Sequence, residues 1–138
     1  MPSNERTMMN TAIKQLVIPI LRQQGFKGSL PHFRRLNENN VDLITFQFNK
    51  WGGSFVVELA VCPKNGTTMD WGEEVPPNKV NAHHMDRRYR LGAVSLGSDG
   101  KWFNYKNAVT DEDYTKVAED ILKLLKTSDS SWISSLLK

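Results

Sequence analysis

The sequence predicts an α+β fold: a mostly antiparallel sheet of about five strands, with an N-terminal helix and one or two C-terminal helices packed on one face. Gly52 and Gly53 separate two apolar-patterned runs, as a turn separates the strands of a hairpin. Apolar residues recur at helical spacing near both ends of the chain. The 138 residues suit a single domain over residues 1–138. Its core should span about residues 9–126, followed by a short terminal helix over 127–138.

The first expected element is an amphipathic helix from about Asn4 to Gln24. Its apolar stripe, which should pack on the sheet, consists of Met9, Ala12, Ile13, Leu16, Val17, Ile20 and Leu21. Pro19 lies inside this pattern, and its ring removes a backbone donor and clashes with the preceding turn. We therefore expect a kink or a break near Pro19. Gly25 should end the helix in a left-handed conformation, with Phe26 packing back on it.

Three strands should follow, over Leu30–Leu36, Val41–Trp51 and Ser54–Cys62. A two-residue turn at Gly52-Gly53 and another at Asn39-Asn40 set their predicted register. The apolar pairs would be Phe48 with Val57, Phe46 with Leu59, Ile44 with Val61 and Phe33 with Phe46. The reverse face is here called the mixed face, because it carries Leu43, Thr45, Gln47, Val56, Glu58 and Ala60. On it, His32, Gln47 and Glu58 would form a row.

The rest of the chain predicts a loop, a hairpin and helices. Pro63–Ala82 lacks periodicity and should be a long loop, anchored by Trp71. Arg88–Leu96 and Lys101–Tyr105 should form a second hairpin around the turn Gly97–Gly100. Thr110, with Asp113 three residues later, should open a helix. Its buried face would hold Tyr114, Val117, Ala118, Ile121, Leu122 and Leu125, and a short helix would start near Ser128.

Composition narrows the class of protein. The net charge of +3 and the pI near 9.1 reflect a small excess of basic residues that is spread along the chain. Nucleic-acid binding is therefore an unfavoured alternative, because such proteins usually concentrate cations on one face. The single cysteine, Cys62, excludes an internal disulfide, and no signal-like start or membrane-length apolar run occurs. A cytoplasmic location without membrane association is expected. His83 and His84 are adjacent and would point opposite ways on an extended chain, so we expect no metal site and no cofactor.

The candidate ligand-binding residues come from the row on the mixed face and from the segment 84–90. They are His32, Gln47, Glu58, His84, Arg88 and Arg90, with Arg34 beside the row. Histidine and glutamate can bind a polar ligand, and two arginines at alternate strand positions suit an anion. A solvated sheet face is the plainer interpretation, since antiparallel sheets commonly leave one face to water. The apolar Leu43, Val56 and Ala60 instead indicate a cover, from the long loop, a partner subunit or a ligand.

The main functional hypothesis is therefore a small binding or protein-interaction domain of unknown biochemical function. Its partner would be an unidentified protein or small-molecule ligand, and a homodimer through the mixed face is a weaker expectation. The alternative from another class is a hydrolase acting on an anionic substrate, using His32 or His84 with Glu58 and the arginine pair. No residue is identified as catalytic. Weak nucleic-acid binding is the third hypothesis.

Several short motifs resemble the domain of unknown function 4304 family. They are Gly25-Phe26-Lys27, Phe33-Arg34, Gly53-Ser54-Phe55 leading into Leu59-Ala60-Val61, and Arg88-Tyr89-Arg90-Leu91-Gly92. The resemblance covers about residues 9–126 and implies a compact bacterial α+β domain without an established activity, substrate or cofactor. It also implies a histidine shortly before the Arg-x-Arg-Leu-Gly stretch. His84 is the nearest counterpart here, at a longer spacing.

Overall fold

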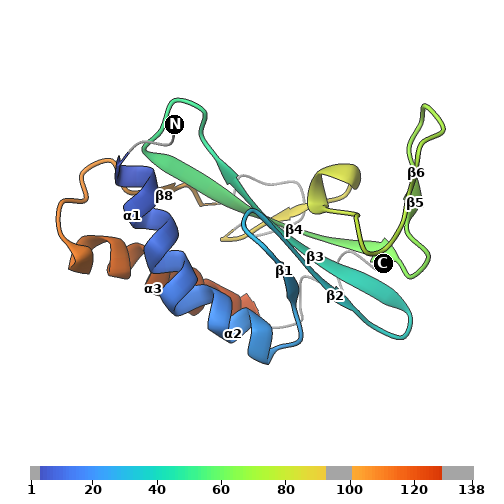
Figure 1. Ribbon diagram of the computed structural model, residues 1–138, viewed down its shortest axis with the longest axis horizontal. Coiled ribbons are helices and arrows are strands. Elements are labelled where there is room, and N and C mark those ends of the chain that lie inside the picture. The colour runs from blue at the N-terminus through green and yellow to red at the C-terminus, as the bar shows by residue number, and fades with distance from the viewer. Residues whose placement is uncertain (1–3, 93–100, 129–138) are drawn as a thin grey trace.

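A computed structural model describes residues 4–92 and 101–128 of the chain. It contains an antiparallel sheet with helices on one face and a long connecting segment on the other (Figure 1). We call this segment, residues 64–88, the cover segment. The α+β class predicted from the sequence is confirmed, with six strands in the main sheet rather than about five.

The N-terminal helix forms as predicted and is irregular where proline requires it. It consists of α1 (Asn4–Ala12), a π-helical turn η1 (Ile13–Val17) and α2 (Ile18–Gln23). The π-helical turn lies immediately before Pro19, where the missing N–H and the bulky ring prevent regular α-helical bonding. At the end, Gly25 has φ +95°, and its N–H donates to the carbonyl of Arg22 while that of Phe26 donates to Leu21. This is the expected left-handed cap.

The main sheet contains β1 (Lys27–Ser29), β2 (His32–Leu36), β3 (Asn40–Phe48), β4 (Ser54–Pro63), β7 (Tyr89–Arg90) and β8 (Phe103–Asn104). The order is β1-β2-β3-β4-β7, and β8 also pairs with β4. β1 was not expected from the sequence. Its three residues fold back on β2, with Gly28 opposite Phe33.

The predicted registers of both hairpins are wrong by two residues. Phe48 lies opposite Phe55 rather than Val57, because the β3–β4 connection spans residues 49–53 instead of two glycines. Gly52 donates its N–H to Asn49 inside this longer loop. His32 likewise lies opposite Thr45 rather than Gln47. A shift of two residues keeps every side chain on its predicted face, whereas a shift of one would have reversed the faces.

The second predicted hairpin is also different from expectation. Tyr89–Arg90 and Phe103–Asn104 both pair with β4, at its middle and its start respectively, instead of forming the main ladder with each other. One backbone bond, from the N–H of Lys101 to the carbonyl of Leu91, still connects the two segments. The predicted turn at 97–100 lies outside the described residues.

The C-terminal helix α3 (Asp111–Ser128) starts at the predicted cap. The N–H of Asp113 donates to Thr110 Oγ1 at 3.2 Å, and Asp113 Oδ2 accepts from the N–H of Thr110 and of Val109. These backbone donors hold the pKa of the Asp113 carboxyl below its ordinary value. Its predicted apolar face packs into the core. The predicted short helix after Ser128 lies outside the described residues.

The main core lies between the helices and the sheet. Its aromatic centre is Phe55, whose ring stacks on Phe103 at 5.3 Å between centroids and also contacts Phe46, Phe48 and Tyr105. The helices add Met9, Ile13, Val17, Leu21, Tyr114, Ala118 and Ile121, all buried.

A hydrogen-bond network around Asp42 connects the β2–β3 hairpin to the end of α2. Asp42 is completely buried. It accepts hydrogen bonds from Arg35, Asn37 and Asn40, and Arg35 also donates to the backbone carbonyl of Gln24 after α2.

The cover segment closes part of the mixed face. It contains β5 (Thr67–Thr68), β6 (Glu74–Val75) and the 3₁₀ turn η2 (Ala82–His84). Val75, Val80 and Ala82 are buried against Val41, Leu43, Ala60 and Cys62 of the sheet. Of the three covers considered from the sequence, the loop is therefore the one observed here. The expected anchor is wrong, however, because Trp71 is 72% exposed and Val80 and Ala82 fill that role.

The turn glycines of the cover segment offer a matched test of this hairpin. Gly66 and Gly72 have nearly the same backbone conformation, with φ +94° and +93°. A Cβ on Gly66 would overlap the backbone oxygen of Val75, whereas a Cβ on Gly72 meets open space. Gly72→Ala should cost about 1–2 kcal/mol of unfolding free energy from backbone strain alone. Gly66→Ala should cost about 1–3 kcal/mol more in urea unfolding. Equal losses would contradict the β5–β6 pairing.

Candidate functional site

A row of polar side chains crosses the mixed face of the sheet. Cross-strand pairing aligns His32 of β2, Thr45 of β3, Glu58 of β4 and Arg90 of β7. Thr45 is completely buried and Glu58 is 4% exposed, whereas His32 and Arg90 are half-buried. Buried polar groups need hydrogen-bond partners, and this row supplies them from within itself and from the cover segment.

Thr45 connects the row to the cover segment. Its Oγ1 accepts the N–H of Ala82 at 3.2 Å and lies 3.0 Å from Nδ1 of His32. A threonine hydroxyl that accepts a backbone N–H still has its own proton to donate. Donation of this proton to the imidazole Nδ1 requires a neutral His32 ring with its proton on Nε2, and the lowered pKa of His32 favours the neutral ring.

Glu58 and Arg90 form the charged centre of the row. Nε and Nη2 of Arg90 both donate to Oε1 of Glu58, at 3.2 and 2.9 Å. The Glu58 side chain is only 6% exposed, so its charge depends on this guanidinium for compensation.

The cover segment brings two more histidines over the row. Asn81 caps η2: its Oδ1 accepts the N–H of His83, and its own N–H donates to Nδ1 of His84 at 3.0 Å. The His83 ring lies edge-on to that of His32, with 6.0 Å between centroids. The sequence holds three histidines in all. All of them therefore meet at this place, which we call the histidine cluster: His32, His83 and His84.

The surroundings of His32 and His83 favour neutral imidazoles. Burial lowers the pKa of His32 below its ordinary value, and His83, Arg34 and His84 lower it further. Burial also lowers the pKa of His83, with Arg88 and His84 acting in the same direction and Glu58 opposing them. A neutral imidazole keeps an N–H donor, so these rings can donate to a ligand without carrying a charge.

Two further arginines border the histidine cluster. Arg34 donates from Nε to the backbone carbonyl of Val80 at 3.0 Å, which ties the cover segment to β2. Arg88 is exposed and close enough to His83 to influence its pKa. Together with Arg90 these are three guanidinium groups, while Glu58 is the carboxylate of the row. The local charge is therefore positive, as an acidic ligand would require.

The structure brings most of the predicted candidates together, with one exception and two additions. Gln47 pairs with Val56 and is exposed, so it is not part of the row and Thr45 takes its place. His83 was not among the candidates, yet its ring, rather than that of His84, contacts His32. The adjacent pair His83-His84 was the available signal, but the sequence did not indicate which ring would turn toward the sheet.

Other reactive groups lie apart from the row. Cys62 is completely buried where the cover segment packs on the sheet, and burial raises the pKa of its thiol. Within the described residues, no group of three His, Cys, Asp or Glu side chains could hold a metal ion. No helix in the described ranges 4–92 and 101–128 is long and apolar enough to cross a membrane.

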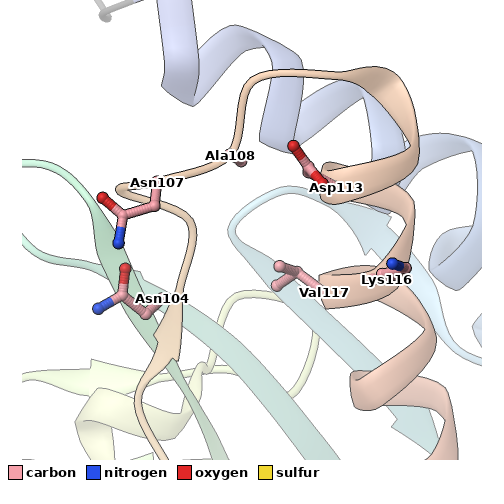
Figure 2. A pocket seen from close by; sticks show the side chains of 6 residues that line it. All are labelled: Asn104, Asn107, Ala108, Asp113, Lys116 and Val117. Carbon is pink, nitrogen blue, oxygen red and sulfur yellow. The ribbon is translucent and has the colours of Figure 1, made fainter.

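A shallow pocket of about 340 Å³ lies elsewhere, between β8 and the start of α3. Figure 2 shows its lining by Asn104, Asn107, Ala108, Asp113, Lys116 and Val117. The Asp113 carboxylate is already used as the helix cap. None of the predicted candidate residues lines this pocket.

The fold and this site define a two-layer α+β domain with a partly covered polar sheet face. Residues 17–135 match the family described as Domain of unknown function (DUF4304), and the chain belongs to that family. No curated protein and no solved structure matches the chain significantly. The family assignment confirms the resemblance and leaves the biochemical function to be inferred from the site.

Removing the Thr45 hydroxyl should destabilise the protein. In Thr45→Val the buried N–H of Ala82 loses its acceptor, which should cost about 1–3 kcal/mol in chemical denaturation. Thr68→Val, at an exposed position of the cover segment, should change stability by less than about 0.5 kcal/mol. A Thr45→Val protein as stable as the wild type would contradict the connection described here.

Stability should also depend on pH through the histidine cluster. His32 and His83 have lowered pKa values in the folded chain, so the unfolded chain binds more protons once the pH falls below about 6.5. The unfolding free energy should therefore be greatest above about pH 7.5 and should decrease as the pH falls through about 6.5, where the unfolded histidines begin to bind protons. The double variant His32→Gln/His83→Gln should show a smaller decrease. The same decrease in both proteins would contradict the prediction.

Proposed function

We propose that this chain is a binding domain that holds an acidic group of a ligand or partner over the polar row. The observation that supports this most directly is that the His83 ring contacts the His32 ring and also lies close enough to the Arg88 guanidinium for that charge to lower its pKa. Two imidazole donors and a cation therefore lie near one another, and His83 and Arg88 are exposed to solvent. Charge-assisted hydrogen bonds from such groups are the usual means of recognising carboxylates and phosphates.

The internal bonding of the row supports a binding role. Thr45 bonds to the N–H of Ala82 and lies beside His32, while Glu58 and Arg90 pair with each other, so these groups need no ligand for their own stability. Arg88, in contrast, is exposed at the end of the cover segment, just before β7 (Tyr89–Arg90). Its guanidinium is available to a carboxylate or a phosphate arriving from solvent.

The hydrolase alternative is less well supported by the same groups. The hydroxyl of Thr45 is buried and accepts a backbone N–H, and the Cys62 thiol is buried with a raised pKa. Neither has the exposed, activated state that a nucleophile needs. An enzyme built on this site would instead use a histidine to activate water, with Arg88 and Arg90 binding the anionic substrate.

Location and assembly also remain proposals. We propose a cytoplasmic protein, supported by a single cysteine that is buried and unpaired. Val56 and Ala60, the apolar residues that suggested a homodimer, are completely buried within this chain and therefore do not support one. Weak nucleic-acid binding is disfavoured by the mild overall charge of +3.

Binding of inorganic phosphate tests the proposal. At constant ionic strength, phosphate should cause saturable shifts of the His32 and His83 ring signals in NMR spectra. Arg88→Ala and His83→Ala should each weaken this binding by about tenfold to 150-fold, since a hydrogen bond to a charged group contributes about 1.5–3 kcal/mol.

Lys14→Ala is the matched control, because it removes the same charge from an exposed position on the helical side of the sheet. It should leave the phosphate affinity unchanged. Shifts that never saturate, or that weaken equally in Arg88→Ala and Lys14→Ala, would overturn the proposed site. Citrate, tested in the same way, would show whether carboxylates are preferred to phosphate.

A further inference from the structure

Trp102 lies next to the polar row and has no part in the binding groups described so far. Phe103, its neighbour, points into the core and stacks on Phe55, so Trp102 points to the opposite, mixed face. The register of β8 on β4, extended by one residue, places it beside the completely buried Val56. Trp102 itself is 47% exposed, so a large part of its surface is open to solvent.

The orientation of Trp102 is supported by a chain of charged contacts. The Arg90 guanidinium lies over its ring, with Cζ 5.5 Å from the ring centroid. That guanidinium is itself held by Oε1 of Glu58 through two donors. A cation above an aromatic face contributes both attraction and a fixed direction. Trp102 therefore lies beside Arg90, at the end of the row away from His32, and its ring is held against the Arg90 guanidinium.

The spacing suits a ligand with two different ends. The His83 ring lies beside His32, at one end of the row, and close enough to Glu58 to interact with its charge. Arg90 is on the next strand, about 5 Å away in a sheet, and Trp102 lies just beyond it. An acidic group at His83 and Arg88 would thus have an exposed indole within the length of a small molecule.

We propose that the ligand of this site is a nucleotide, whose phosphate binds at His83 and Arg88 and whose base stacks on Trp102. This inference rests on the proposed function and specifies its ligand class. A nucleobase has a flat π-face that stacks on indole regardless of base identity. A phosphate next to such a ring is the combination that the imidazoles, the guanidinium groups and Trp102 would recognise together.

Calorimetric titration with adenosine 5′-monophosphate and with ribose 5-phosphate tests the inference. The two probes share a phosphate, and only the first has a base. Stacking should make the nucleotide bind about fivefold to 150-fold more tightly than the sugar phosphate. Trp102→Leu, which still covers Val56, should abolish this ratio and leave ribose 5-phosphate affinity unchanged. Trp51→Leu is the control, since Trp51 is 84% exposed at the far tip of the β3–β4 hairpin.

The outcomes separate the two proposals. If both probes bind with equal affinity, or if Trp102→Leu keeps the ratio, the nucleotide inference fails while the acidic-group site remains. If neither probe binds and phosphate causes no saturable shift, both proposals fail. If the ratio disappears in Trp51→Leu as well, stacking occurs at another tryptophan and the inference is overturned.

Discussion

The long antiparallel ladder of β3 and β4 is the constraint on which the rest of this structure depends. Residues 41–46 and 55–60 of these strands are buried throughout, so both faces of the hairpin are covered. An antiparallel sheet more often leaves one face to water. Here the N-terminal helix and α3 bury one face around Phe55, and the cover segment buries part of the other through Val75, Val80 and Ala82. Removing the cover would expose an apolar surface and the hydroxyl of Thr45.

Covering the second face determines the chemistry of the polar row. Thr45 and Glu58 cannot be hydrated where they lie, so each has a partner that the fold supplies: the Ala82 N–H for the first and Arg90 for the second. The same burial lowers the pKa of His32 and His83 and leaves them as neutral donors. The residues proposed to recognise a ligand therefore belong to the same row that stabilises the sheet, with the inner members bonded to the protein and the outer ones facing solvent.

Most residues of the candidate site could be predicted from the sequence, but not all of them. His32, Glu58 and Arg90 do lie in one row, because a strand places alternate residues on one face whatever the exact register. The sequence predicts Gln47 in that row because it predicts two-residue turns at both Asn39-Asn40 and Gly52-Gly53. The loop observed spans residues 49–53, and Thr45 occupies the position instead. The choice between His83 and His84 depends on the cap that Asn81 makes, and no periodicity in the sequence encodes it.

The sequence by itself determined the local features: the irregular helix at Pro19, the left-handed cap at Gly25, the Thr110–Asp113 cap and the two faces of the hairpin. Each depends on backbone sterics or on the spacing of neighbouring residues, which a short window contains. Only the tertiary structure decided the strand registers, the covering of the mixed face and the meeting of three histidines. These depend on contacts between distant segments, such as Arg34 with Val80 and Thr45 with Ala82, whose free energy comes from packing and desolvation that no local pattern records.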